Sequence, residues 1–176
     1  TVCEELAALS GFKCLTITKK DFPKIKTVEE AEETPPAISL EAFNKGEIYF
    51  ICSGEEKIAG GLLRTLEKVK NSKINLVYIL RDTDLLSETI VTQQRAFFKI
   101  LQNYARSGLF ESMLCVSEPI IKNSFMAGVS MLEYKKKFSE TLAKMINMVN
   151  WLKGAVPFNS EIDQPSEACR INTLGV

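Results

Sequence analysis

Short strand-like runs alternate with stretches of helical periodicity along this chain, and the alternation limits the folds that it can adopt. The clearest strand is residues 74–80, a continuous apolar run that is typical of a strand covered on both faces of a parallel sheet. Apolar residues at helical spacing follow it. Strands joined through helices pair in parallel, so the pattern predicts an α/β fold, a three-layer sandwich with a mostly parallel sheet.

The expected elements follow one another in a simple order. We predict strands at residues 12–18, 48–52, 74–80 and 113–116, and helices at residues 1–9, 58–69, 90–107 and 133–152. All 176 residues are expected to form a single α/β domain: 1–45 as a first unit with an acidic loop, 46–165 as the core region, and 166–176 as the start of a further strand. Because the chain opens at Thr1 without a methionine, we expect it to be a fragment.

The charge balance excludes some classes of partner. Lys and Arg number 22, and so do Asp and Glu, which gives a net charge of zero and disfavours binding to nucleic acid or an anionic membrane. No apolar run approaches the roughly 18 residues that a transmembrane helix needs. The chain has no histidine, so it contains no serine–histidine or cysteine–histidine catalytic pair and no imidazole metal ligand.

The cysteines predict a reducing compartment. They are five in number, widely spaced and mostly within apolar segments, whereas a disulfide scaffold or zinc site would show closer pairs. Buried thiols acting as small apolar residues are the simplest interpretation. With no secretory signal in view, we expect a cytoplasmic protein. The five positions are Cys3, Cys14, Cys52, Cys115 and Cys169.

The loop after residue 52 is the most informative candidate site. Ser53 and Gly54, then Gly60 and Gly61, lie between a predicted strand and a predicted helix. Glycines at that place allow backbone amides to approach a phosphate, and the helix amino terminus adds partial positive charge. The spacing fits neither the Walker pattern nor G-x-G-x-x-G, so an ordinary strand-to-helix turn remains the simpler interpretation.

The order of further motifs extends this candidate site along the chain. A helix carrying an arginine follows the clearest strand, a short strand then leads into a polar loop, and a long helix ends before an acidic loop. From Gly46 to about Asp163 the chain resembles the nucleotide-binding domain of the tubulin and FtsZ superfamily. The segments that carry the resemblance are Ile51-Cys52-Ser53-Gly54, Ala59-Gly60-Gly61, Arg95-Ala96-Phe97-Phe98, Ser117-Glu118-Pro119, the helix from Tyr134, and Phe158-Asn159-Ser160-Glu161-Ile162-Asp163.

This resemblance implies a ligand, a mode of assembly and a set of site residues. GTP or GDP, with Mg²⁺, is the implied ligand, and self-association into filaments is the implied assembly. In that family acidic residues of one subunit activate the water that attacks the neighbour's nucleotide, so Glu161 and Asp163 are the implied catalytic residues of an assembly-dependent GTPase. The implied nucleotide-binding residues are Ser53, Gly54, Gly60, Gly61, Arg95 and Tyr134.

Two other hypotheses stay open. Glu55, Glu56 and Glu118 stand where the family holds phosphate or nucleotide, and their charge favours a non-enzymatic assembly module that keeps the fold without the nucleotide. The order of elements also fits a flavodoxin-like or Rossmann-like domain that binds another small ligand. Arg95 and Tyr134 can equally be an ordinary surface arginine and an amphipathic helix residue.

Overall fold

The computed structural model describes residues 1–10, 12–22, 30, 36–56, 58–84, 86–156 and 169–174. Their contacts divide the chain into two compact units. The first, which we call the sheet unit, comprises residues 17–118 and 166–175. The second, the helical unit, comprises residues 1–16, 119–165 and 176.

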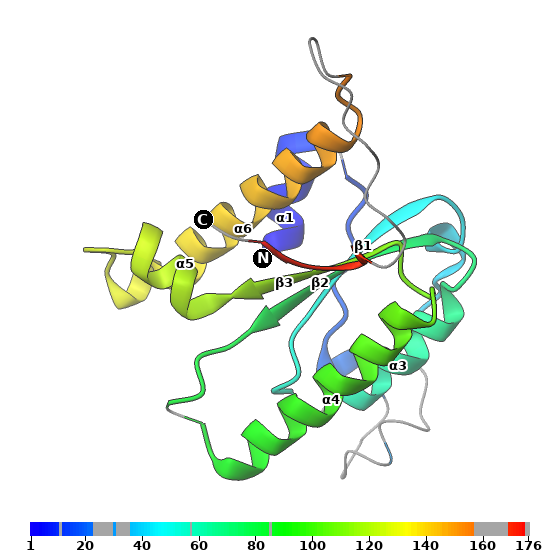
Figure 1. Cartoon of the computed structure of the whole chain (residues 1–176), viewed down its shortest axis with the longest axis horizontal. Coiled ribbons are helices and arrows are strands. Elements are labelled where there is room, and N and C mark those ends of the chain that lie inside the picture. Colours follow the sequence, from blue (N-terminus) through cyan, green and yellow to red (C-terminus); the bar gives the residue numbers. More distant parts are fainter. Residues whose placement is uncertain are drawn as a thin grey trace. The chain divides into compact units, whose positions relative to one another are not determined.

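The sheet unit is built on parallel strands. These are β1 (Glu47–Cys52), β2 (Lys73–Leu80), β3 (Ser112–Ser117) and β4 (Ile171–Leu174), and they lie in the order β1-β2-β3-β4 (Figure 1). Every pair of neighbours in this sheet is parallel. The predicted α/β class with a parallel sheet is therefore confirmed, and so are the strands expected at 48–52, 74–80 and 113–116 and the one beginning at 171.

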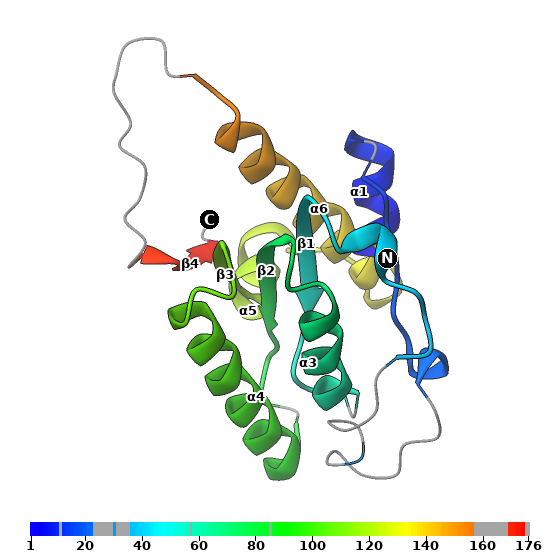
Figure 2. The same cartoon turned by 90° about the vertical axis from the view of Figure 1, so that its right-hand side faces the viewer.

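Two helices cover one face of this sheet. α3 (Ala59–Lys68) and α4 (Glu88–Arg106) lie side by side on that face (Figures 1 and 2). They pack against alternate residues of the strands, because successive side chains of a strand point to opposite faces. Each fully buried aliphatic side chain contributes about 1.5–3 kcal/mol. The fully buried members of this core include Leu66, Ile74, Leu76, Leu101 and Met113.

The carboxyl end of the sheet carries a row of three buried side chains. Cys52 of β1 is aligned with Tyr78 of β2, which is aligned with Cys115 of β3. Burial raises the pKa of both thiols and of the tyrosine hydroxyl above their ordinary values. The interpretation of these two cysteines as small buried apolar residues is therefore confirmed.

One polar residue interrupts the apolar run of β2 and is fully satisfied. Asn75 is completely buried, its Nδ2 donates to Glu47 Oε1 at 2.6 Å, and its Oδ1 accepts from Ser112 Oγ at 2.7 Å. Glu47 and Ser112 lie on the two neighbouring strands. Because both bonds cross strand boundaries, they select this register over one shifted by two residues.

The helical unit contains α1 (Val2–Ser10), α5 (Glu118–Phe125), which begins at the junction of the two units, and α6 (Met131–Lys153). α1 packs against α6 (Figure 1). Ser130 caps α6, accepting from the backbone N–H of Glu133. The buried side chains of these helices include Leu6, Ile121, Phe138, Leu142 and Ile146.

Two segments differ from the sequence-based prediction. Residues 12–18 form no strand; most of them are exposed, and without a partner strand their β-propensity has nothing to pair with. Instead, Thr18 starts a short 3-10 helix, η1 (Lys19–Asp21), through a capping box with Asp21. The hydrogen bonds from the Thr18 backbone and hydroxyl hold the pKa of Asp21 below its usual value.

The second difference concerns the residues after β3. The polar segment Ser117-Glu118-Pro119 was expected to be a loop, but Ser117 ends the strand and Glu118 begins α5 directly. Proline is compatible with the first turn of a helix, where its missing N–H has no intrahelical acceptor to lose. No helix of the described residues is long and apolar enough to cross a membrane.

Candidate functional site at the carboxyl edge of the sheet

Three charged side chains, each of which follows a different strand, meet at the carboxyl edge of the sheet. Arg81 directly follows β2, and its Nη1 lies 2.9 Å from Glu118 Oε1 while its Nε lies 3.2 Å from Glu55 Oε1. Glu55 follows β1, and Glu118 follows β3. β1 and β3 flank β2, so the parallel sheet brings the three loops together at one edge. We call this group the Glu55–Arg81–Glu118 cluster.

The cluster is mostly shielded from solvent. Glu118 is 8% exposed, and the side chains of Arg81 and Glu55 are 33% and 25% exposed. Two carboxylates share one guanidinium, which leaves one net negative charge at the carboxyl edge. Glu56 of the same loop forms a separate ion pair, with Lys19 Nζ at 2.7 Å. The three glutamates that stand where the family resemblance implies a nucleotide each form an ion pair with a cation of this chain.

Gly54 is a site of close packing. A Cβ atom at Gly54 would lie 2.7 Å from Tyr78 Oη and 3.1 Å from Gln94 Cα. It would also lie 3.3 Å from Phe97 Cδ1. Only glycine fits between β2 and α4 here, and the space beside its Cα is filled by protein atoms.

The polar groups of the β1–α3 loop are also engaged. The backbone of Gly54 hydrogen-bonds the Tyr78 hydroxyl, which lowers the pKa of Tyr78 against the larger effect of burial. The Tyr78 hydroxyl donates to the Gln94 carbonyl at 3.4 Å. Gln93 Nε2 donates to the carbonyl oxygens of Gly54, at 2.8 Å, and Glu56, at 3.0 Å. The carbonyl oxygen of Gly54 is thus occupied by Gln93, and the hydroxyl of Tyr78 is bound to the Gln94 carbonyl.

The second glycine pair lies in the first turn of α3. Both Gly60 and Gly61 are buried, and the ring of Phe22 lies against the position that a Cβ of Gly61 would take. The carbonyl oxygen of Gly61 accepts from Thr65 Oγ1 at 3.0 Å. Ile58 at the amino end of α3 provides no side-chain cap. The small size of Gly61 is explained by the packing of the aromatic ring of Phe22.

The other predicted site residues lie on several elements, and Ser53 belongs to the β1–α3 loop itself. Ser53 is half-buried directly after β1, and Arg95 is exposed in the second turn of α4. Tyr134 belongs to the helical unit, where its ring stacks on that of Phe138 with centroids 6.1 Å apart. Glu161 and Asp163 lie outside the described residues. Within the described part of the chain, no three Cys, Asp or Glu side chains are placed to hold a metal ion.

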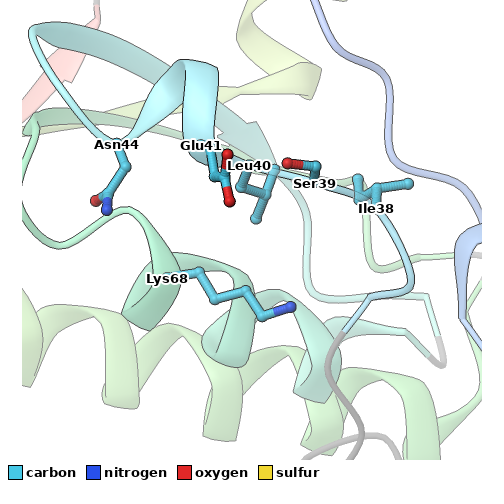
Figure 3. Close-up of a pocket in the computed structure, with 6 residues that line it drawn as sticks. All are labelled: Ile38, Ser39, Leu40, Glu41, Asn44 and Lys68. Atoms are coloured by element: carbon cyan, nitrogen blue, oxygen red, sulfur yellow. The ribbon is translucent and has the colours of Figure 1, made fainter.

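A pocket of about 270 Å³ lies at the end of α3 away from the β1–α3 loop. Figure 3 shows Lys68 of α3 on one side of it and residues of the 38–44 segment on the other. That segment includes the 3-10 helix η2 (Glu41–Phe43). Lys68 Nζ donates to the Pro36 carbonyl at 3.3 Å. Asn44 Oδ1 is buried and has no hydrogen-bond partner among the described residues.

Arg81 directly follows the clearest predicted strand, and Asp82 and Asp84 are the carboxylates nearest to it along the chain. The structure instead pairs it with Glu55 of the β1–α3 loop and Glu118 at the start of α5, while Asp82 accepts from the backbone N–H of Asp84 at 3.1 Å. The sequence does contain a signal for this pairing, since each of the three charged residues comes shortly after a predicted strand. The carboxyl ends of adjacent parallel strands meet at one edge of the sheet, so residues at these positions lie close together.

The chain was also compared with known proteins. No family model matches this chain, and neither a curated protein nor a solved structure matches it.

Proposed function

We propose that this chain is a non-enzymatic assembly module, in which the α/β sheet unit is a packed scaffold and the helical unit binds a second copy of the chain. The observation that carries the proposal is the filled space at Gly54. The Tyr78 hydroxyl occupies the volume beside its Cα, and Gln93 Nε2 already donates to its carbonyl oxygen. A phosphate group would have to displace a buried tyrosine to occupy the space beside the Cα of Gly54.

The electrostatics of the same edge support this proposal. The guanidinium of Arg81 already forms ion pairs with Glu55 and Glu118. The cluster as a whole carries one net negative charge, which repels a triphosphate. Freeing Arg81 would leave the Glu118 side chain, which is 11% exposed, without this cation, at considerable cost.

The competing proposal is that guanine nucleotide, with Mg²⁺, binds at the β1–α3 loop and drives assembly as in the tubulin and FtsZ superfamily. The location of this loop at the carboxyl edge of a parallel sheet supports it, because ligands of such sheets bind there. In this second proposal the nucleotide contacts of Ser53, Gly54, Gly60, Gly61, Arg95 and Tyr134 require the loop to open.

The two proposals predict different responses to GTP. We expect purified protein to release no GDP or GTP on denaturation, and we expect millimolar GTP with Mg²⁺ to raise the free energy of unfolding by less than about 0.5 kcal/mol. Ion-exchange chromatography of the denatured supernatant and urea unfolding with and without GTP measure these quantities. About one nucleotide per chain, or strong protection by GTP that ATP does not reproduce, would overturn the non-enzymatic proposal.

The surface for assembly is argued from the distribution of exposed apolar side chains. Every large apolar side chain that is exposed among the described residues belongs to the helical unit. Three of them, Met148, Trp151 and Leu152, are spaced by three and four residues in the last turns of α6, and we call them the α6 tail surface. They are 57%, 70% and 55% exposed.

A second copy of this chain is the occupant that the charges favour. The chain has 22 basic and 22 acidic residues, so two copies approach each other without net repulsion at neutral pH. Tryptophan and methionine are enriched at the centres of protein interfaces. In a self-complementary dimer the α6 tail surface of one copy packs against the same surface of the second copy. A single symmetric interface then buries the exposed apolar side chains of both copies.

Replacing Trp151 by serine is expected to weaken self-association at least about tenfold, because a central tryptophan commonly contributes 2 kcal/mol or more to an interface. Sedimentation velocity over a concentration series measures the change. Leu132→Ser is the matched control: Leu132 is 96% exposed at the other end of α6, and its substitution should leave the association constant unchanged. A monomeric wild type, or equal effects of both substitutions, would contradict the proposed surface.

A further inference from the structure

Cys3 and Cys14 lie next to each other in the helical unit. Cys3 is in the first turn of α1, and Cys14 is in the irregular segment that follows the helix. Cys14 Sγ donates to the Cys3 carbonyl oxygen at 2.8 Å, and Cys3 Sγ lies 4.0 Å from the Leu15 carbonyl oxygen. The Cys14 thiol therefore contacts the backbone of Cys3, and the Cys3 thiol lies near the backbone of Leu15, the residue after Cys14.

The two thiols are accessible, contrary to the expectation that the cysteines are buried. Cys14 is exposed and Cys3 is half-buried, and both are free. The reason is local: residues 12–18 do not join the sheet, so Cys14 is not covered as a strand residue would be. Cys169 is also exposed, and it belongs to the sheet unit. Only Cys52 and Cys115 match the expected burial.

We propose that Cys3 and Cys14 form a redox-active dithiol, which a low-molecular-weight disulfide such as oxidised glutathione converts into an intramolecular disulfide. The exposed Cys14 thiolate attacks one sulfur of oxidised glutathione and releases the first glutathione thiolate. The Cys3 thiolate then attacks Cys14 Sγ of the mixed disulfide and releases the second. The two protein thiols lose two electrons and two protons, and the two glutathione thiolates take up the protons.

The surroundings of the pair determine how this reaction depends on pH. Burial raises the pKa of the Cys14 thiol, and the charge and hydrogen bond of the neighbouring Cys3 side chain raise it further. Most of the thiol is protonated at neutral pH, so the first step is slow there and accelerates as the pH rises. Proximity of the two thiols, not unusual reactivity of either one, then drives the second step. The product would join the first turn of α1 covalently to the segment after the helix.

Peptide mapping of the whole chain tests the proposal. The protein is equilibrated with mixtures of oxidised and reduced glutathione, quenched in acid, alkylated and digested with trypsin. Cleavage after Lys13 and Lys19 separates the two cysteines, so the disulfide appears as residues 1–13 linked to residues 14–19. We expect this linked pair to form at a ratio of oxidised to reduced glutathione about tenfold lower in the folded chain than in the urea-denatured chain.

The other exposed thiol provides the matched control. Cys169→Ser should leave the 1–13 to 14–19 link unchanged, and Cys14→Ser should abolish it and leave Cys3 alkylated or bound to one glutathione. Because the wild-type map alone detects the link, the test does not depend on the folding of a variant. Mixed disulfides without the link, a link from either residue to Cys169, or equal formation in folded and denatured chains would each overturn the proposal.

Discussion

Replacing Gly54 by alanine is expected to lower the free energy of unfolding by about 3 kcal/mol, the upper part of the range for overpacking a closed site. The new methyl group would lie 2.7 Å from Tyr78 Oη and 3.1 Å from a backbone atom of α4. The hydroxyl can move only by giving up its hydrogen bonds, and the helix backbone cannot move without disturbing the core around Phe97 and Leu101. Urea denaturation followed by circular dichroism measures the loss.

Two further variants separate this packing effect from the general cost of changing a glycine. Gly154→Ala is the matched control, because the added Cβ would meet nothing closer than 3.7 Å, and its effect should stay within about 0.5 kcal/mol. Tyr78→Phe removes the nearest atom, so Gly54→Ala should cost less in that background than in the wild type, a coupling that a double-mutant cycle reports. Equal costs in both backgrounds would show that the tyrosine hydroxyl does not close the site.

The second large effect is expected at the Glu55–Arg81–Glu118 cluster. Replacing Arg81 by methionine keeps the length of the side chain and removes its charge, which leaves the carboxylate of Glu118 shielded from solvent without its cation. Breaking a buried ion pair from one side commonly costs 3–5 kcal/mol, and the 33% exposure of the Arg81 side chain reduces this to about 2–3 kcal/mol. The free energy of unfolding at neutral pH is the measured quantity.

The two carboxylates of the cluster supply an internal comparison. Glu118→Gln added to Arg81→Met should recover part of the lost stability, because a neutral amide replaces the uncompensated charge. Glu55→Gln in the same background should recover less, since Glu55 is more exposed and its oxygen lies farther from the guanidinium. If Arg81→Met were neutral, the cluster would be a surface ion pair with no part in holding the three loops together.

Much of the architecture of the sheet unit can be predicted from the sequence. The continuous apolar run of β2 and the helical spacing of Leu62, Leu66 and Val69 are local signals, and both elements formed where they were expected. The sequence alone did not distinguish residues 12–18 from a true strand, because their β-propensity resembles that of β3. What distinguishes the two is a partner: β3 lies between β2 and β4, and residues 12–18 pair with no strand.

The candidate site was predictable only in position. The order of strands and helices along the chain predicts that a ligand site would lie in a loop at the carboxyl edge of the parallel sheet. That order does not predict whether the glycines of the loop face a ligand or a neighbouring side chain. Gly54 and Tyr78 are 24 residues apart, Gly61 and Phe22 are 39 apart, and no local pattern indicates that these pairs meet.

The sequence by itself determined the α/β class, the strands and helices of the sheet unit, and the absence of any histidine chemistry, because periodicity and composition are properties of neighbouring residues. Tertiary structure alone decided that Arg81 is held by Glu55 and Glu118, that Gly54 is closed by Tyr78, and that Cys3 lies beside Cys14. Each of these depends on contacts between residues far apart in the chain, and such contacts exist only once the elements have packed.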